Sequence, residues 1–284
     1  MRFSAPGLLG LFLALWASAM PLDQGETDFM TVRPSVAKDY DSPQEIPTEK
    51  FFRESSFHYH YDGRFANITL SDEKVIPHLS ALITTYLETM ASIGAETWIM
   101  HGTLLSWWWN QMIFPWDNDL DVQISEATIH FLADYYNMTE HHFELPHVEG
   151  GRTYLLEINP YYVVKSTKDT LNVIDGRWID MSSGLFIDIT AVRKDDEKRK
   201  TGYKEALMCK DRHHYDESDI FPLRQSYFEG VPVKVPYAYT DLLVEEYGPA
   251  SLTQTEFQGH RFNADSKIWE RLKQKLKRLV QAWR

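Results

Sequence analysis

Apolar residues recur with helical spacing in several segments of the chain. Between residues 76 and 90 they fall at every third or fourth position, which predicts a helix that begins or kinks at Pro77 and ends at Gly94. Similar spacing predicts further helices at residues 126–136 and 239–247. These helices would pack their apolar sides on a sheet.

The last helical pattern covers residues 266–283. It places apolar side chains on one side of a predicted helix and many Lys and Arg side chains on the other. We expect this helix to pack against the domain. The alternative is attachment to an anionic membrane surface, which the same pattern also suits.

Other segments have the composition of strands. Residues 96–101, 154–165 and 184–192 are rich in apolar, aromatic and β-branched side chains. Residues 220–236 contain short runs with a Glu-Gly pair between them, which predicts a β-hairpin. Because helices and strands alternate, the predicted fold class is α/β, with a mixed sheet of the α+β kind.

The two ends of the chain differ from its middle. Residues 1–19 join Arg2, an apolar stretch and Ala-Ser-Ala, which predicts a signal peptide, with an uncleaved membrane anchor as the alternative. Residues 20–50 are polar and acidic and predict a flexible linker. We expect a folded domain at 51–250 and the terminal helix within 251–284.

The composition restricts the partners. The formal net charge of -12 argues against nucleic acid as a ligand, because phosphate backbones are held by clusters of Lys and Arg. Sequons at Asn67 and Asn137 predict glycosylation in the secretory pathway, in the Golgi lumen or on a secreted protein. The single cysteine, Cys209, excludes an intramolecular disulfide, so packing must stabilise the fold.

Two aspartates stand out in the segment His101 to Val122. In a strand, residues two apart share a face, so Asp119 and Asp121 would present adjacent carboxylates while their neighbours face the core. Mg²⁺ or Mn²⁺ would relieve the repulsion between them, since such ions take oxygen ligands and bridge carboxylates to substrate phosphates. Alone, the Asp-x-Asp pattern is also common on solvated surfaces.

The surrounding residues support the metal interpretation. A predicted strand enters a His101-Gly102-Thr103 turn, and the aromatic run 107–109 that follows has the character of a buried helix that Pro115 ends. Gly102 would let the backbone approach donor phosphates, and Thr103 could donate a hydrogen bond to them. The acidic strand begins directly afterwards.

A third carboxylate lies in an apolar strand. Asp188 is the one charged residue of the run 184–192, and buried charges are usually paired or bound to metal. A core aspartate that caps a turn is the alternative. Arg193 and Lys194 follow closely and could approach a donor phosphate, although a solvated loop is the simpler interpretation.

His58 and His60 are candidate zinc ligands, because two nearby histidines can bind zinc. No further Cys or His follows them at a ligand-like spacing, so packing around the adjacent Asp-Gly turn is the preferred interpretation.

These motifs together resemble the LicD/fukutin family of phosphotransferases, a branch of the nucleotidyltransferase-fold superfamily. The matching stretches are residues 101–105, 114–122, 185–189 and 221–248, and the aromatic lead-in is similar to fungal members connected with mannosylphosphate addition. The resemblance implies a nucleotidyltransferase-like core with added helices and a C-terminal hairpin and helix region.

The resemblance also implies a chemistry. Metal would bind Asp119 and Asp121, with Asp188 as third carboxylate, and His101, Gly102 and Thr103 would contact the donor. We therefore expect transfer of a phosphorylated sugar or alcohol from a GDP- or CDP-linked donor to a glycan hydroxyl. The rivals are an Asp-x-Asp glycosyltransferase and a noncatalytic subunit that supports a partner transferase.

Overall fold

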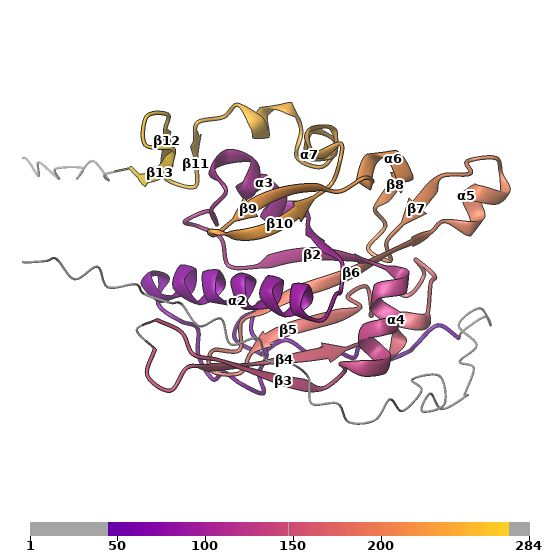
Figure 1. Ribbon diagram of the computed structural model, residues 1–284, viewed down its shortest axis with the longest axis horizontal. Coiled ribbons are helices and arrows are strands. Elements are labelled where there is room, and N and C mark those ends of the chain that lie inside the picture. Colours follow the sequence, from indigo (N-terminus) through magenta and orange to yellow (C-terminus); the bar gives the residue numbers. More distant parts are fainter. Residues whose placement is uncertain (1–44, 147, 273–284) are drawn as a thin grey trace, which may run out of the picture. The chain divides into compact units, whose positions relative to one another are not determined.

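A mixed sheet forms the centre of the computed structural model, which describes residues 45–146 and 148–272. Its strand order is β1-β2-β6-β5-β4-β3, and β7 extends it by pairing with β6 and β8 (Figure 1). β2 and β6 run parallel, whereas the other neighbouring strands of this sheet are antiparallel. Its strands are β1 (Thr97–Ile99), β2 (Leu120–Ser125), β3 (Thr139–Phe143), β4 (Arg152–Ile158), β5 (Gly176–Asp180), β6 (Phe186–Lys194), β7 (Ala206–Met208) and β8 (His214–Asp216).

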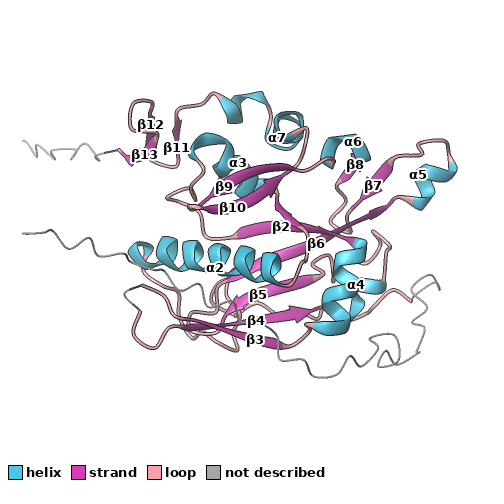
Figure 2. Cartoon of the chain, viewed as in Figure 1, coloured by secondary structure: helices cyan, strands magenta, loops and turns pink. Residues whose placement is uncertain are grey.

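Helices and two small sheets surround the main sheet, which confirms the predicted mixed α/β fold class (Figure 2). A hairpin joins β9 (Arg224–Phe228) to β10 (Val231–Val235), as the sequence predicts. The helices are α2 (Asp72–Ser92), α3 (His101–Asn110), α4 (Glu126–Tyr135), α5 (Asp196–Lys200), α6 (Glu217–Ile220) and α7 (Tyr239–Tyr247), with short 3₁₀ helices η1 (Pro160–Val163) and η2 (Pro249–Leu252).

The predicted helix at 76–90 is present as α2, but it begins earlier. It starts at Asp72, so Pro77 lies inside the helix instead of at its start. Because Pro77 is only a few residues from the N-terminus, the one backbone bond that it removes belongs to the first two turns. The helix packs against β5, β6 and β10 through buried residues such as Leu82, Ile83 and Tyr86.

The predicted terminal helix is wrong where the structure describes it. Residues 268–271 form strand β13 (Ile268–Arg271), which pairs with β12 (His260–Asn263), and β12 pairs with β11 (Glu256–Phe257). Asn263 accepts backbone hydrogen bonds from Asp265 and Ser266, which makes a tight turn between the last two strands. Trp269 is thereby buried among other aromatic rings. Residues 273–284 lie outside the described residues.

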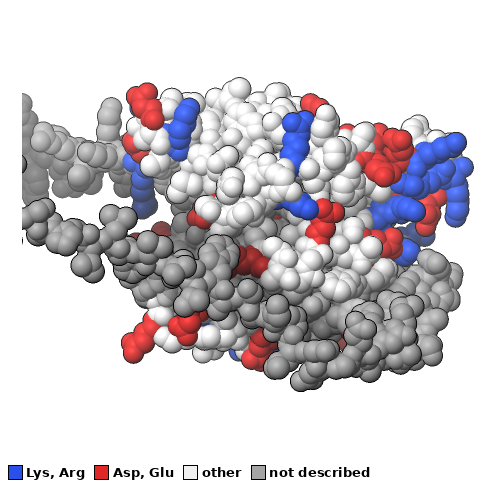
Figure 3. Space-filling view, in the orientation of Figure 1, with Lys and Arg blue, Asp and Glu red and all other residues white. Residues whose placement is uncertain are grey.

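The run from Arg193 to Lys200 is only partly the solvated loop that the sequence predicts. Arg193 and Lys194 complete strand β6, and the charged residues after them form the short helix α5. Lys and Arg side chains of α5 gather at one end of the face shown in Figure 3. The predicted strand 154–165 is likewise shorter, because Pro160 begins the 3₁₀ helix η1.

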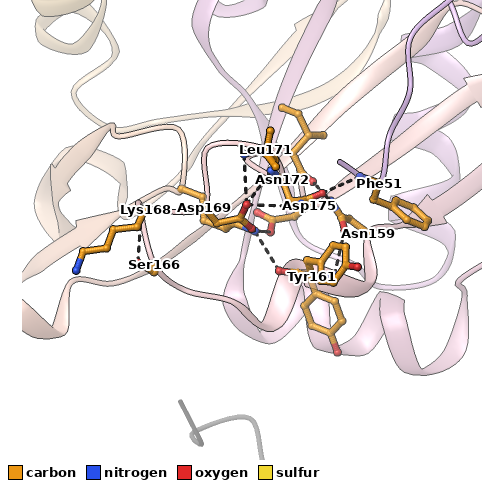
Figure 4. A network of polar contacts seen from close by, with 12 residues as sticks. Phe51, Asn159, Tyr161, Ser166, Lys168, Asp169, Leu171, Asn172 and Asp175 are labelled. Atoms are coloured by element: carbon orange, nitrogen blue, oxygen red, sulfur yellow. Dashed lines mark hydrogen bonds and ion pairs between the residues drawn. The ribbon is translucent and has the colours of Figure 1, made fainter. Parts of the chain in front are cut away.

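A buried polar network holds the segment between β4 and β5 in place (Figure 4). The Arg193 guanidinium lies 2.8 Å from a carboxylate oxygen of Asp175, and both side chains are almost fully buried. Lys210, also buried, has its ammonium 3.3 Å from Asp169. Asn172 accepts from the Phe51 backbone N–H and so ties the first described residues to the same network. Each buried charge therefore has an opposite charge beside it, as burial requires.

The two predicted terminal segments fall largely outside the described residues. The predicted signal peptide (1–19) and most of the predicted linker (20–50) precede residue 45. Of the helices within residues 45–146 and 148–272, none is both long enough and apolar enough to cross a bilayer.

Candidate functional site

The parallel pair of strands brings two of the predicted aspartates together. Asp121 on β2 is the direct register partner of Asp188 on β6. Leu120 and Val122 on either side of Asp121 are buried in the core, while Asp121 itself is partly exposed. The alternation that the sequence predicts is thus present around Asp121, although Gln123 on the same face of β2 is buried.

Asp119 and Asp117 precede β2 and complete an acidic group with Asp121. Asp119 lies one residue before the strand and its side chain is 42% exposed. Asp117 interacts with both Asp119 and Asp121 through charge and is hydrogen-bonded to Asp119. Asp117 was not among the residues predicted from the sequence, although the alternation Asp-Asn-Asp-Leu-Asp contains the signal that would have found it.

Crowding changes the acidity of these carboxyl groups. Burial, with the charges of Asp119 and Asp188 adding to it and His101 opposing it, raises the pKa of Asp121 to about 8. Burial and the charges of Asp119 and Asp121 raise the pKa of Asp117 well above its usual value. Without a cation, Asp121 therefore keeps a proton at neutral pH.

Asp188 has a partner that the sequence reasoning missed. Arg177 on β5 is its antiparallel register partner and donates from Nε to Asp188 Oδ1 at 2.7 Å. Arg177 also donates to Glu54 at 3.0 Å, and its side chain is 2% exposed. Burial still raises the pKa of Asp188 against this positive charge. Asp175 and Asp180 lie on either side of Arg177 in the sequence, so no isolated charge in an apolar run distinguishes it there.

His60 lies beside the acidic group. Its Nδ1 is 3.7 Å from Asp119 Oδ2, and its side chain is 15% exposed. Burial lowers the pKa of His60, and the charge of Asp119 only partly opposes this, so the imidazole is neutral at pH 7. The sequence predicts only that His58 and His60 pack around the adjacent Asp-Gly turn. The position of His60 beside the aspartates was not predicted.

His101 begins helix α3 instead of a turn, and it does so with a left-handed backbone, φ 54°. This conformation is strained for a residue with a side chain and is often found at functional sites. The Nδ1 atom lies 3.0 Å from both carboxylate oxygens of Glu246 on α7. Burial lowers the pKa of His101, but the bond to Glu246 and the charges of Glu246 and Asp121 outweigh it and raise the pKa above its usual value.

Other ligand-type side chains surround His101. Its Nε2 is 3.7 Å from Asp211 Oδ2, and its ring centre is 4.5 Å from that of His213. Potential ligand atoms of His101, His213 and Glu246 all lie within 4.8 Å of one another. Nitrogen and oxygen ligands at such distances could hold a cation beside the acidic group.

Thr103 and Gly102 occupy different positions from those predicted. The Thr103 hydroxyl accepts a hydrogen bond from the Asp121 backbone N–H at 2.9 Å and is buried, so it fixes the start of β2 against α3. Gly102 lines a pocket, and a β-carbon there would meet only the Tyr247 hydroxyl at 4.0 Å. Gly102 therefore borders open space beside the acidic group.

The structure does not bring Arg193 and Lys194 to the aspartates. They lie at the far end of β6, five and six residues beyond Asp188, which is roughly 17–20 Å in an extended strand. Arg193 is buried against Asp175, and Lys194 is exposed where β6 pairs with β7. The sequence places them close to Asp188, but the strand continues straight through both.

An aromatic pocket of about 340 Å³ adjoins the acidic group. Asp117 belongs to its wall, together with Gly102 and Tyr247. The remaining lining residues come from α3, the segment before β2, the region of η2, and the small sheet: Leu105, Trp109, Phe114, Trp116, Ala250, Ser251, Gln254, Phe257 and Trp269.

Comparisons with known proteins identify the family of this domain. Residues 94–238, just over half of the chain, match the LicD/FKTN/FKRP nucleotidyltransferase domain, and the match includes Asp117, Asp119, Asp121, Arg177 and Asp188. Mannosyltransferase regulator 4 of Saccharomyces cerevisiae is 36% identical over 137 residues, which are 47% of this chain and 12% of the yeast protein. Mannosyltransferase regulator 14 of the same yeast is 30% identical over 178 residues, which are 57% of this chain and 19% of that protein.

This chain therefore matches only a small part of these much longer curated relatives. The extent of the domain match nevertheless confirms the resemblance drawn from the motifs: the chain belongs to the LicD/FKTN/FKRP nucleotidyltransferase-domain family.

Proposed function

We propose that this chain is a metal-dependent transferase that moves a phosphorylated sugar or alcohol, such as mannose phosphate, from a nucleotide-diphosphate donor to a glycan hydroxyl. The observation that carries the proposal is the register of Asp121 opposite Asp188, with Asp117 and Asp119 directly before β2. The family supports phosphate chemistry, and the yeast relatives, named as mannosyltransferase regulators, support a setting in glycan mannosylation.

The residues present fit a hard divalent cation. The crowded carboxyl groups of Asp117 and Asp121, whose pKa values are raised, offer oxygen ligands that Mg²⁺ or Mn²⁺ would bind in their deprotonated form. Asp119 and Asp121 would hold the ion, with Asp117 and Asp188 as further oxygen ligands. When bound, the ion would neutralise charge that develops on the donor phosphates.

The chain's own residues would handle the proton and the donor. In the reaction, the acceptor oxygen attacks the donor phosphorus, the bond to the nucleoside monophosphate breaks, and the acceptor loses its proton. Asp188 could accept that proton, as could the neutral imidazole of His60, which lies beside Asp119. His101, with its pKa raised by Glu246, would present a positive charge to the donor phosphates.

The proposed compartment is the secretory pathway, in the Golgi lumen or after secretion. Glycan acceptors are present there, and Asn67 and Asn137 are both exposed in the structure, as glycosylation requires. The predicted leader would deliver the chain to that compartment. Membrane association through an uncleaved leader is the alternative arrangement.

A noncatalytic supporting subunit of a partner transferase is the second candidate. Two observations favour it: both yeast relatives are named regulators, and Asp188 is already neutralised by a buried arginine. A glycosyltransferase would use the same aspartates but would transfer the sugar without its phosphate.

One experiment separates these functions. The purified full-length chain is incubated with GDP- and CDP-linked donors, an oligomannose acceptor and Mg²⁺ or Mn²⁺, and the released nucleotides are separated by chromatography. Release of a nucleoside monophosphate that Asp121→Ala lowers by at least about 100-fold is the result expected. Release of the diphosphate indicates a glycosyltransferase, and no turnover with any donor, despite metal binding, supports the subunit.

A further inference from the structure

The aromatic pocket beside the acidic group has features of a carbohydrate site. Six of its twelve lining residues are aromatic, and few polar side chains accompany them. Ligand pockets commonly combine an apolar lining with a few polar groups that fix orientation, and their volumes run from about 300 to about 1,000 Å³. The volume of about 340 Å³ suits a ligand of one or two rings.

The small sheet builds one side of the pocket. The Trp269 ring centre on β13 lies 4.9 Å from Trp109 on α3 and 5.0 Å from Trp116. Phe257 on β11 lies 5.6 Å from Trp116 and is 49% exposed, so part of its ring is available to a ligand. Both sheet residues lie beyond residues 94–238, so this wall is not part of the matched domain.

One donor in this wall has no acceptor. The Trp109 Nε1–H donates to the Ser251 carbonyl at 3.0 Å, as a buried indole normally does. The Trp269 Nε1 is also buried, yet it has no hydrogen-bond partner among the residues that the structure describes. A buried donor without a partner is destabilising. Because this atom has almost no accessible surface, a ligand hydroxyl would bond to it only after the surrounding rings shift.

The charges of the lining select the ligand class. No Lys or Arg occurs among the described residues that line the pocket, and Asp117 contributes a carboxyl group. Away from Asp117 and the metal ion that it would help to hold, a nucleotide phosphate would gain no counter-charge, so the rest of the pocket does not suit the donor's anionic part. A neutral pyranose fits better, because its hydroxyl groups can donate to Asp117, Ser251 and Gln254 while its C–H face lies on the electron-rich aromatic rings.

We propose that this pocket binds a neutral hexose ring of the acceptor glycan. Because Asp117 belongs both to the pocket wall and to the acidic group, a bound ring would present a hydroxyl toward the aspartates. The term acceptor rests on the proposed function, whereas binding of the sugar does not.

Binding can be measured without metal or donor. Methyl α-mannopyranoside and α-linked mannobiose are titrated into the full-length chain in EDTA, and tryptophan fluorescence reports occupancy, because three tryptophans line the pocket. We expect saturable binding that Phe257→Ala weakens about 3- to 10-fold, the range of one aromatic contact. Tyr227→Ala on β9 is the matched control, since that ring is 60% exposed and is not in the lining, and it should bind as the wild type does.

The outcomes separate this inference from the proposed function. Gln254→Ala is exposed enough to leave the fold intact and should also weaken sugar binding. Absence of saturable sugar binding, equal affinity in both pocket variants and the wild type, or binding of CMP or GMP that Phe257→Ala weakens would each overturn the inference. Sugar binding without any nucleotide turnover would leave the pocket assignment standing and remove the proposed function.

Discussion

The crowded carboxyl group of Asp121 makes a prediction about stability. Replacing it with asparagine keeps the size of the side chain and removes the charge. In the metal-free protein, we expect Asp121→Asn to be more stable than the wild type at neutral pH, although the residue is central to the proposed chemistry. A residue whose removal stabilises the fold is one that the fold holds for another purpose.

The direction of this stability change follows from the pKa of Asp121 in the unfolded and folded states. An unfolded aspartate has a pKa of about 3.9. In the folded protein the pKa of Asp121 is raised to about 8, so the folded state keeps a proton that the unfolded state has lost. The contribution of protonated Asp121 to the free energy of unfolding is fully present below the pKa that it has in the unfolded state. It is lost progressively as the pH rises toward the pKa of the folded state.

The size of the stability change follows from the difference between these two pKa values. Between these two pKa values, each pH unit lowers the free energy of unfolding of the wild type by about 1.4 kcal/mol if Asp121 titrates alone. Partial exposure of Asp121 and sharing of its proton with neighbouring carboxyl groups reduce this loss to about half. The asparagine variant has no such loss. Its advantage should be about 2 kcal/mol at pH 7.5 and under about 1 kcal/mol at pH 5, and the larger value corresponds to about 4–8 °C in melting temperature.

The assay is thermal and urea unfolding in EDTA at pH 5, 6.5 and 7.5. Asp265→Asn serves as the control, because that aspartate is exposed and lies away from the acidic group in the turn before β13. Addition of Mn²⁺ at pH 7.5 should stabilise the wild type and leave Asp121→Asn nearly unchanged. An asparagine variant less stable than the wild type at pH 7.5 without metal would refute the reasoning.

Three further predictions concern the buried charges and the surface. Arg177→Gln should lower the free energy of unfolding by about 3–5 kcal/mol in urea titrations, because it leaves Asp188 buried without its positive partner. An unchanged midpoint would contradict that pairing. Arg193→Met should destabilise the fold by a similar amount without changing the donor KM of the remaining folded enzyme, since its guanidinium bonds to buried partners at the far end of β6. A raised donor KM at full stability would restore its predicted role in donor binding. Protein from a secretory host should lose mass on glycosidase treatment through glycans on Asn67, Asn137 or both, and an unchanged intact mass would argue against the proposed compartment.

Local pattern was enough to predict much of the fold. The helical spacing before Gly94 and the alternation around Asp121 both reflect burial on one side of an element, which neighbouring residues in the sequence record directly. The pairing of Asp121 with Asp188 could be anticipated only as proximity, because strand order and register depend on contacts between distant segments.

The errors arose where distant contacts decided the outcome. Trp269 has helical spacing with its neighbours, yet the segment forms β13 and buries the Trp269 ring against Trp109 of α3. Arg193 is close to Asp188 in sequence, but an extended strand separates them in space. Arg177 and Glu246 reach the site from β5 and α7, and no short motif links them to the aspartates.

The small sheet β11–β13 has a consequence for how this protein could diversify. The carboxylates are carried by the paired strands β2 and β6, whereas one wall of the adjoining pocket is carried by a separate three-stranded unit that meets α3 through aromatic rings. Substitutions on that unit can reshape the pocket without altering the spacing of the carboxylates. Under the proposed function, ligand preference and reaction chemistry would therefore be encoded in largely different elements, with Asp117 shared between them, so one could change while the other is retained.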